Sequence, residues 1–258
     1  MDRPLLEVNK LSKHFGGVQA LDGLDLTVAR NSILGLIGPN GSGKTTFFNV
    51  VTGIYPASSG QVIFDGQDIT NLAPQKVYRA GVARTFQRSR LLLPLSILDN
   101  IALGDHSRLN HGLVFNLLKR RALAAQLADC RQKAGDLLGI FDPDLAGRLA
   151  EPVASLPMIS RRRIEICRAL ISGPKLLLLD EPSAGMTHEE TFRLVDDILA
   201  VKQRLKDLTI IIIEHEMSVM ERSTDHCAVL NFGTKICEGA YAQVAADPQV
   251  QEAYLGVD

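Results

Sequence analysis

The chain has 258 residues, of which 46% are hydrophobic and 22% charged, and its formal net charge is −1. This composition is typical of a globular protein that forms one domain, or one domain with a sizeable subdomain. The near-neutral charge gives no support for a nucleic-acid-binding tail or a polybasic membrane anchor, so no nucleic-acid partner is expected. The four cysteines have no metal-ligand spacing and are expected to be reduced and structural, as in the cytosol.

Membrane-inserting segments are not expected. The first four residues lack the apolar stretch of a signal peptide, and no apolar run approaches the eighteen or so residues needed to span a bilayer. If the protein works at a membrane, we expect a partner to hold it there.

The first third of the chain reads as strands and short helices. Alternating or apolar runs predict strands, and helical spacing ending at glycine predicts a helix over Thr46–Thr52. A second short helix is expected over Pro74–Ala80. The predicted strands cover Leu5–Asn9, Leu24–Val28, Ile33–Ile37, Gln61–Phe64 and Val82–Phe86.

Strand signals disappear from about Arg88 to Ser155, where Leu, Ala and Ile recur at helical spacing, notably from Leu113 to Gly139. This predicts a helical subdomain, residues 88–155, inserted into an α/β nucleotide-binding core formed by residues 1–87 and 156–258 of one domain. Strands alternating with helices imply a mainly parallel sheet in that core. The later elements are expected as helices over Arg161–Ile171 and Glu189–Leu205, strands over Lys175–Leu179 and Thr209–Ile213, short strands around Ala228 and Ile236, and terminal helices.

A glycine-rich loop lies between the strand at 33–37 and the helix that follows it. It matches Gly-x4-Gly-Lys-[Ser/Thr], the phosphate-binding P-loop, and the flanking strand and helix supply the context that this motif requires. Its glycines let successive N–H groups point at phosphate oxygens, and the helix start adds a positive dipole end. We therefore predict a nucleoside triphosphate site formed by Gly38, Pro39, Asn40, Gly41, Ser42, Gly43, Lys44, Thr45 and Thr46, with a chance glycine loop beside a surface lysine as the alternative.

Two residues of this loop carry specific chemistry. Lys44 supplies a mobile cation for the β- and γ-phosphates, and the Thr45 hydroxyl can bind Mg²⁺. A nucleoside triphosphate and Mg²⁺ are therefore the expected cofactors.

Polar residues follow two other apolar strands. Asp180 suits the Mg²⁺-holding position of a Walker B strand, and Glu181 is placed to orient or deprotonate the attacking water. His215 follows the strand at 209–213, at the edge where open α/β sheets bind ligands, and could contact the γ-phosphate. The alternatives are a buried strand with an acidic end and a histidine that is merely hydrogen-bonded.

The order of these motifs resembles an ABC-transporter ATPase subunit over nearly the whole chain. The resemblance rests on the P-loop, Phe86-Gln87, a Leu-x4-Arg-Arg run starting at Leu156, Asp180-Glu181-Pro182 and His215. Short runs resemble the branched-chain amino-acid importer branch in particular; they lie at residues 82–87, 181–186, 213–217, 238–239 and 253–256.

The resemblance implies a P-loop NTPase (RecA-like) α/β core with an N-terminal antiparallel β subdomain. It also implies further roles: Gln87 meets Mg²⁺ and the attacking water, Phe15 stacks on adenine beside Val18, residues 183–186 touch a partner subunit, and His215 is the switch histidine. For Phe15, a place in the core is the alternative.

The resemblance also implies partners. Two ATPase subunits, alike or different, close head to tail on ATP and act on transmembrane permease subunits, served indirectly by a solute-binding protein. The expected place is the cytoplasmic face of the cell membrane, and the expected activity is ATP hydrolysis coupled to transport.

One segment departs from the family pattern. Where family members have Leu-Ser-Gly-Gly-Gln, this chain has Leu156-Pro157-Met158-Ile159-Ser160, and Pro157 offers neither an N–H nor a hydroxyl. Ser160 could instead cap the helix that follows. We expect this chain's own P-loop site to be intact and the site that it offers to a partner to be impaired. A hydrolysis-poor regulatory subunit of a heterodimer is the main alternative, and a non-transport P-loop enzyme such as a small kinase is another.

Overall fold

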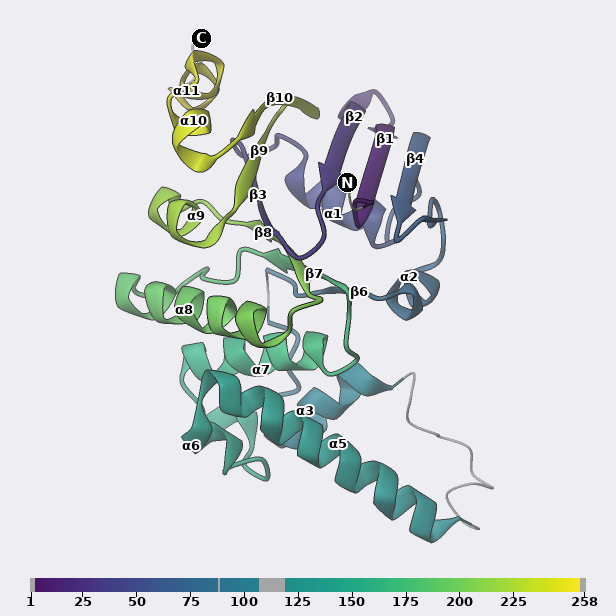
Figure 1. The fold of residues 1–258 in the computed structure, drawn as a ribbon, viewed down its shortest axis with the longest axis vertical. Helices are drawn as coiled ribbons and strands as arrows, with labels where there is room; N and C mark the ends of the chain where they lie inside the picture. The colour runs from purple at the N-terminus through teal and green to yellow at the C-terminus, as the bar shows by residue number, and fades with distance from the viewer. Residues whose placement is uncertain (1–2, 88, 107–118, 256–258) are drawn as a thin grey trace. The chain divides into compact units, whose positions relative to one another are not determined.

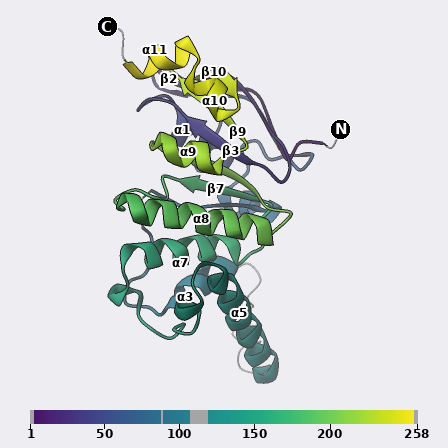
Figure 2. The same cartoon turned by 60° about the vertical axis from the view of Figure 1, so that its left-hand side comes forward.

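The computed structural model describes residues 3–87, 89–106 and 119–255. The chain divides into two compact units, which are described separately here (Figures 1 and 2). The first unit contains Met1–Arg84, Lys175–Pro182 and Leu205–Asp258, and the second contains Thr85–Pro174 and Ser183–Arg204. The predicted domain boundaries, with an insertion at 88–155, stay a prediction.

A six-stranded sheet forms the centre of the first unit. Its order is β10-β9-β3-β8-β7-β6, and all neighbours are parallel except β9 and β10. All five residues of β3, β7 and β8 are buried, because a parallel sheet is covered on both faces. This confirms the mainly parallel sheet. The strands are β3 (Ile33–Ile37), β6 (Val82–Arg84), β7 (Leu176–Asp180), β8 (Thr209–Ile213), β9 (His226–Asn231) and β10 (Thr234–Gly239).

A separate antiparallel sheet carries the N-terminal strands of the same unit, as predicted. Its order is β2-β1-β4-β5, and it shares one core with the six-stranded sheet and helix α1. Phe47 and Phe48 of α1 are fully buried in that core. The strands are β1 (Leu6–Phe15), β2 (Val18–Val28), β4 (Ser59–Phe64) and β5 (Gln67–Asp68); the helices are α1 (Lys44–Val51), α2 (Pro74–Ala80), α9 (Met217–Ser223), α10 (Tyr241–Ala245) and α11 (Pro248–Leu255).

The second unit is helical in its described part, where the only β-bridge joins Ser96 and Pro152. Arg163 of α7 forms ion pairs at 2.8 Å with two other segments of this unit: with Asp142, just before α6, and with Asp197 of α8. The elements are α3 (Ile97–Ala102), η1 (Leu103–Asp105), α5 (Arg120–Phe141), α6 (Pro143–Ala146), η2 (Val153–Ser155), α7 (Met158–Leu170) and α8 (His188–Arg204). The predicted helical stretch from Leu113 falls partly at 113–118, outside the described residues.

Two local predictions need correction, and one helix was missed. The strand predicted over Val82–Phe86 ends at Arg84, because only Val82, Ala83 and Arg84 pair with β7. Helix α7 begins at Met158, so Ser160 is a buried residue of its first turn and does not cap it. Helix α9 was not predicted.

The sequence predicted no membrane-spanning segment. Over 3–87, 89–106 and 119–255, no helix is both long enough and apolar enough to cross a bilayer.

Candidate functional site

The glycine loop leaves β3 and enters α1 through three residues with positive φ: Gly38 (145°), Gly41 (81°) and Gly43 (106°). L-residues rarely adopt these values. Two of the positions also lack room, because a Cβ on Gly38 would lie 2.1 Å from the Leu230 carbonyl oxygen, and one on Gly43 2.6 Å from that of Ala20. The loop therefore keeps its shape only with glycine.

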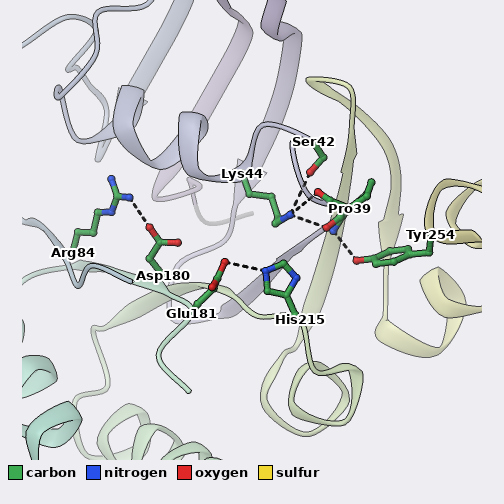
Figure 3. Close-up of polar contacts among 9 residues, drawn as sticks. Pro39, Ser42, Lys44, Arg84, Asp180, Glu181, His215 and Tyr254 are labelled. Atoms are coloured by element: carbon green, nitrogen blue, oxygen red, sulfur yellow. Dashed lines mark hydrogen bonds and ion pairs between the residues drawn. The ribbon is translucent and has the colours of Figure 1, made fainter. Parts of the chain in front are cut away.

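Lys44 starts α1 and bends back over the loop (Figure 3). Its Nζ donates to the carbonyl oxygens of Gly38 and Pro39, at 2.7 and 2.9 Å, and to Ser42 Oγ at 3.4 Å. Burial lowers the pKa of Lys44, while the charges of Glu181 and Asp180 act to raise it. The ammonium thus lies in the loop, solvated by carbonyl groups that a phosphate can replace.

A cavity of about 150 Å³ opens in front of the loop. Its walls come from four places in the sequence: β2, the loop with the start of α1, the end of β7 and the end of β8. The lining residues are Ala20, Asn40, Gly41, Ser42, Gly43, Lys44, Thr45, Thr46, Glu181 and His215. The structure therefore brings the predicted phosphate loop together with the carboxylate and the histidine expected beside it.

Glu181 and His215, which both line this cavity, are in contact with each other (Figure 3). Glu181 Oε1 lies 2.9 Å from His215 Nε2, where the imidazole N–H can donate to the carboxylate. Glu181 has φ of 46°, which is uncommon for a residue with a side chain, and its N–H donates to the Ile213 carbonyl at 2.9 Å. Such strain is concentrated at functional sites.

Asp180, one residue earlier, is buried and bound to Arg84. Arg84 Nη2 donates to Asp180 Oδ2 at 2.6 Å, and both side chains are at most 5% exposed. Arg84 was not singled out from the sequence. Its partner is 96 residues away, so only the parallel pairing of β6 and β7 reveals the contact.

The oxygen donors of this site are of the kind that Mg²⁺ binds. In the part of the chain that the structure describes, no three Asp, Glu, His or Cys side chains gather as a metal cage. Mg²⁺ beside a nucleotide usually takes only one or two protein ligands, with phosphates and waters completing its shell. Thr45 and Asp180 offer the hard oxygen ligands that this ion prefers, so the residues present fit it.

Phe15 is 42% exposed and Val18 67% exposed, so the alternative of a core phenylalanine is wrong. The Phe15 ring meets Tyr55 edge to face, with 5.2 Å between ring centroids, and Lys13 Nζ lies 4.8 Å from the Phe15 centroid. An exposed aromatic pair with a cation can stack on a nucleobase. Tyr55 was not predicted; its only sequence signal is an aromatic in the loop after α1.

Gln87 lies in the second unit, where its backbone is held by α7. Arg162 Nη2 donates to the Gln87 carbonyl at 3.0 Å. Arg162 also pairs with Glu165, which accepts the N–H of Arg90 at 3.0 Å. Two buried charged residues of α7 thus fix the loop that carries Gln87.

Comparison with known proteins settles the family. Residues 21–184 match the ABC transporter family, and residues 234–258 match the family of branched-chain amino acid ATP-binding cassette transporters. The chain belongs to the ABC transporter family. As an ATP-binding subunit of this family, it is an ATPase coupled to transport.

Two curated relatives of this ABC ATPase cover it almost completely. It is 36% identical over 260 residues to the high-affinity branched-chain amino acid transport ATP-binding protein BraF of Pseudomonas aeruginosa, and 36% identical over 259 residues to LivG of Escherichia coli K12, a protein of the same description. Each comparison covers 99% of both chains.

The ABC fold is confirmed by solved structures. A nucleotide-free ATP-binding cassette from an ABC transporter superposes with a TM-score of 0.84 at 30% identity, covering 99% of this chain and 100% of that one. The ADP conformation of an ABC transporter cassette gives the same TM-score, identity and coverage.

The C-terminal helix of this ABC subunit contributes to the phosphate loop. Gly38 N–H donates to the Tyr254 phenol oxygen at 2.8 Å (Figure 3), and burial raises the pKa of Tyr254. The sequence singled out Tyr254 only as part of a branch-specific run. Its contact lies 216 residues away along the chain, which no local pattern indicates.

The segment that departs from the ABC pattern lies at the start of α7. Pro157 is the N-cap residue of that helix and makes no side-chain cap hydrogen bond. Met158 is 48% exposed, whereas Ser160 is buried. No hydroxyl therefore stands at the N-cap of this helix.

Proposed function

We propose that this chain is the ATP-hydrolysing subunit that powers import of branched-chain or related amino acids through a partner permease. One observation carries the proposal: the cavity in which the P-loop lysine, Glu181 and His215 meet. Full-length similarity to BraF and LivG, both described as branched-chain amino acid transport proteins, supports the substrate class.

The roles of the site residues follow from their chemistry. The N–H groups of residues 38–46 and Lys44 hold the phosphates of ATP. Thr45 and Asp180, with Gln87, are the ligands proposed for Mg²⁺, which when bound neutralises charge on the β- and γ-phosphates. Phe15 and Val18 receive the adenine, with Tyr55 behind Phe15.

Glu181 is the proposed general base for the attacking water. Its hydrogen bond to His215 fixes the carboxylate at the edge of the cavity. Because the imidazole lines the same cavity, His215 can contact the γ-phosphate of bound ATP. When the γ-phosphate is cleaved off, His215 loses that contact, and its hydrogen bond to Glu181 changes with it.

The partners follow from the proposed transport role. They are transmembrane permease subunits, a second ATPase subunit and, indirectly, a solute-binding protein. The chain would lie on the cytoplasmic face of the membrane, held there by the permease.

The segment at 156–160 points to an asymmetric pair of ATPase subunits. Pro157 and Met158 replace the hydroxyl and the bare backbone that would hold a γ-phosphate bound to the partner. In a heterodimer, this chain's Lys44, Asp180 and Glu181 would work with the intact segment of a paralogue. The same segment favours the second candidate function, an ATP-binding regulatory subunit with little hydrolysis of its own.

The test is reconstitution of the full chain with candidate permease subunits and a paralogous ATPase from the same organism. We expect co-purification, Mg·ATP binding, and ATP-dependent uptake of labelled leucine into vesicles. ATP binding without uptake of leucine or any related amino acid would favour the regulatory subunit. Purified chain with no affinity for Mg·ATP would contradict both functions.

A further inference from the structure

Arg84 sits where the phosphate loop helix and the Asp180 strand come together, and the family pattern gives it no role. Its guanidinium has two arms with different partners. Nη2 donates to Asp180 Oδ2 at 2.6 Å, and Nη1 donates to Asn49 Oδ1 at 2.7 Å. Asn49 belongs to α1, the helix that begins with Lys44. One side chain therefore links the Mg²⁺-binding carboxylate to the P-loop helix.

The strand register explains how this link forms. Arg84 of β6 pairs with Leu178 of β7, and Asp180 lies two residues further along β7. Because side chains two residues apart share one face of a sheet, Asp180 and Leu178 lie on the same face. Leu178 belongs to the core that includes Phe47 and Phe48 of α1. The Arg84 side chain thus runs under α1 toward Asp180.

The surroundings hold the guanidinium in place. Its central carbon lies 5.3 Å from the centroid of the Phe48 ring, and the Arg84 side chain is 5% exposed. A buried charge-assisted bond keeps one geometry, since little water competes for it. Lysine offers a single point charge, whereas the planar fork of arginine can bind two acceptors at fixed angles.

We propose that Arg84 is the positioning residue that orients Asp180 toward the metal. In Figure 3 the Asp180 carboxylate lies with Arg84 on one side and with Lys44 and Glu181 on the other. With Oδ2 bound by Arg84, the rotation of the carboxylate is fixed relative to α1 and therefore relative to Thr45. The inference rests on the proposed function, because it assumes that Asp180 binds Mg²⁺ beside ATP.

The consequence is a selective effect on the metal. Residues that orient a metal ligand typically change metal affinity by about 10- to 100-fold when they are lost. In the proposed function the phosphates themselves are held by the loop and by Lys44, whose ammonium is bound by the carbonyl oxygens of Gly38 and Pro39. Loss of Arg84 should therefore weaken the binding of Mg·ATP and leave the binding of metal-free ATP nearly unchanged.

The experiment measures the dissociation constant of ATP twice, in excess Mg²⁺ and in excess EDTA, for the full chain and its Arg84→Gln variant. We expect the constant in Mg²⁺ to rise about tenfold and the constant in EDTA to change less than about twofold. Arg84→Lys should recover part of the loss. The matched control is Arg30→Gln, which removes an arginine paired with Asp65 elsewhere in the same unit.

Other outcomes would overturn the inference. An equal rise in both constants would show a purely structural ion pair, and tighter Mg²⁺-dependent binding would show that Arg84 competes with the metal. If Arg84→Gln does not fold, Asn49→Ala removes only the second arm; it should shift the constant in Mg²⁺ in the same direction by a smaller factor, and no shift would contradict the proposal. Wild-type chain that binds ATP under neither condition would instead contradict the proposed function.

Discussion

Two helices of this protein begin in opposite ways, α1 in the first unit and α7 in the second. Helix α1 follows three glycines with positive φ, and its first turn faces a cavity. Helix α7 follows Pro157 and exposes Met158 at its first position, and neither helix has a side-chain cap. Every helix start has unpaired N–H groups and a positive dipole end.

The difference shows that the start of a helix can bind phosphate only when the residues before it leave space for the phosphate group and supply N–H hydrogen-bond donors. At α1 the glycines provide both, and Lys44 adds a charge. At α7 the N-cap proline lacks an N–H, and Met158 follows it with a half-exposed side chain where α1 has glycines before it. The start of α1 therefore has the backbone shape of a phosphate site, whereas the start of α7 has a proline in place of glycines. Each prediction that follows tests one of these two helix starts.

The largest effect is expected from Glu181→Gln. Loss of a general base typically costs about 10²- to 10⁴-fold in rate, so ATP turnover in the assembled transporter should fall by at least a hundredfold while Mg·ATP still binds. Single-turnover hydrolysis and equilibrium binding measure the two effects. Glu189→Gln, in an exposed ion pair of α8, is the control. Unchanged turnover would show that the P-loop site of this chain, at the start of α1, does not hydrolyse ATP.

The second-largest effect is expected from restoring the family's Ser-Gly-Gly-Gln sequence at the start of α7. Replacing residues 157–160 with Ser-Gly-Gly-Gln should raise the ATPase rate of the purified chain alone about tenfold or more, because one preorganised donor is worth about 10²- to 10³-fold. Pro157→Ala restores only an N–H and should give a much smaller gain. If the full replacement leaves the rate unchanged, the α7 start does not limit hydrolysis.

A stability change of intermediate size is expected from Gly43→Ala. The new Cβ would meet the Ala20 carbonyl at 2.6 Å in a backbone conformation that costs about 1–3 kcal/mol for an L-residue. Gly41→Ala is the matched control, since that position also has positive φ but has no atom within 4 Å of the new Cβ. Thermal unfolding without nucleotide should show the larger loss for Gly43→Ala. Equal losses would mean that close packing does not shape the loop.

The smallest effect is expected from Phe15→Ala. Stacking of a base on an aromatic ring is worth about 1–3 kcal/mol, and Tyr55 remains beside it, so the dissociation constant of ATP should rise about five- to tenfold. Leu127→Ala removes an exposed apolar side chain of α5 and should have no effect. A weakened binding of inorganic triphosphate in the Phe15 variant would contradict a role at the base.

Much of the fold could be predicted because its signals are local. The strand Thr209–Ile213 has the predicted bounds because a run of four isoleucines marks it. The helix Pro74–Ala80 also has the predicted bounds, because a proline marks its first residue and Gly81 follows its last. The glycine loop was equally visible. Its convergence with Glu181 and His215 followed from the rule that parallel strands deliver their carboxyl ends to one edge.

The rest depended on contacts that the local sequence does not contain. Helix α9 lacks a side-chain cap and is short, so it gave no start signal. Ser160 looked like a cap, but the proline three residues earlier was the better signal for the start of α7. Arg84 meets Asp180 only because β6 and β7 are neighbours in the sheet, and Tyr254 meets Gly38 only because α11 returns to the loop.

The place of β3 has a consequence for how this protein is made. The strand that carries the P-loop pairs with β8 and β9, which come from residues 209–231. On the ribosome, the nucleotide loop is synthesised long before either neighbouring strand exists. The central sheet must wait for this non-local pairing. Residues 33–37 therefore have no sheet neighbours until most of the chain has been synthesised.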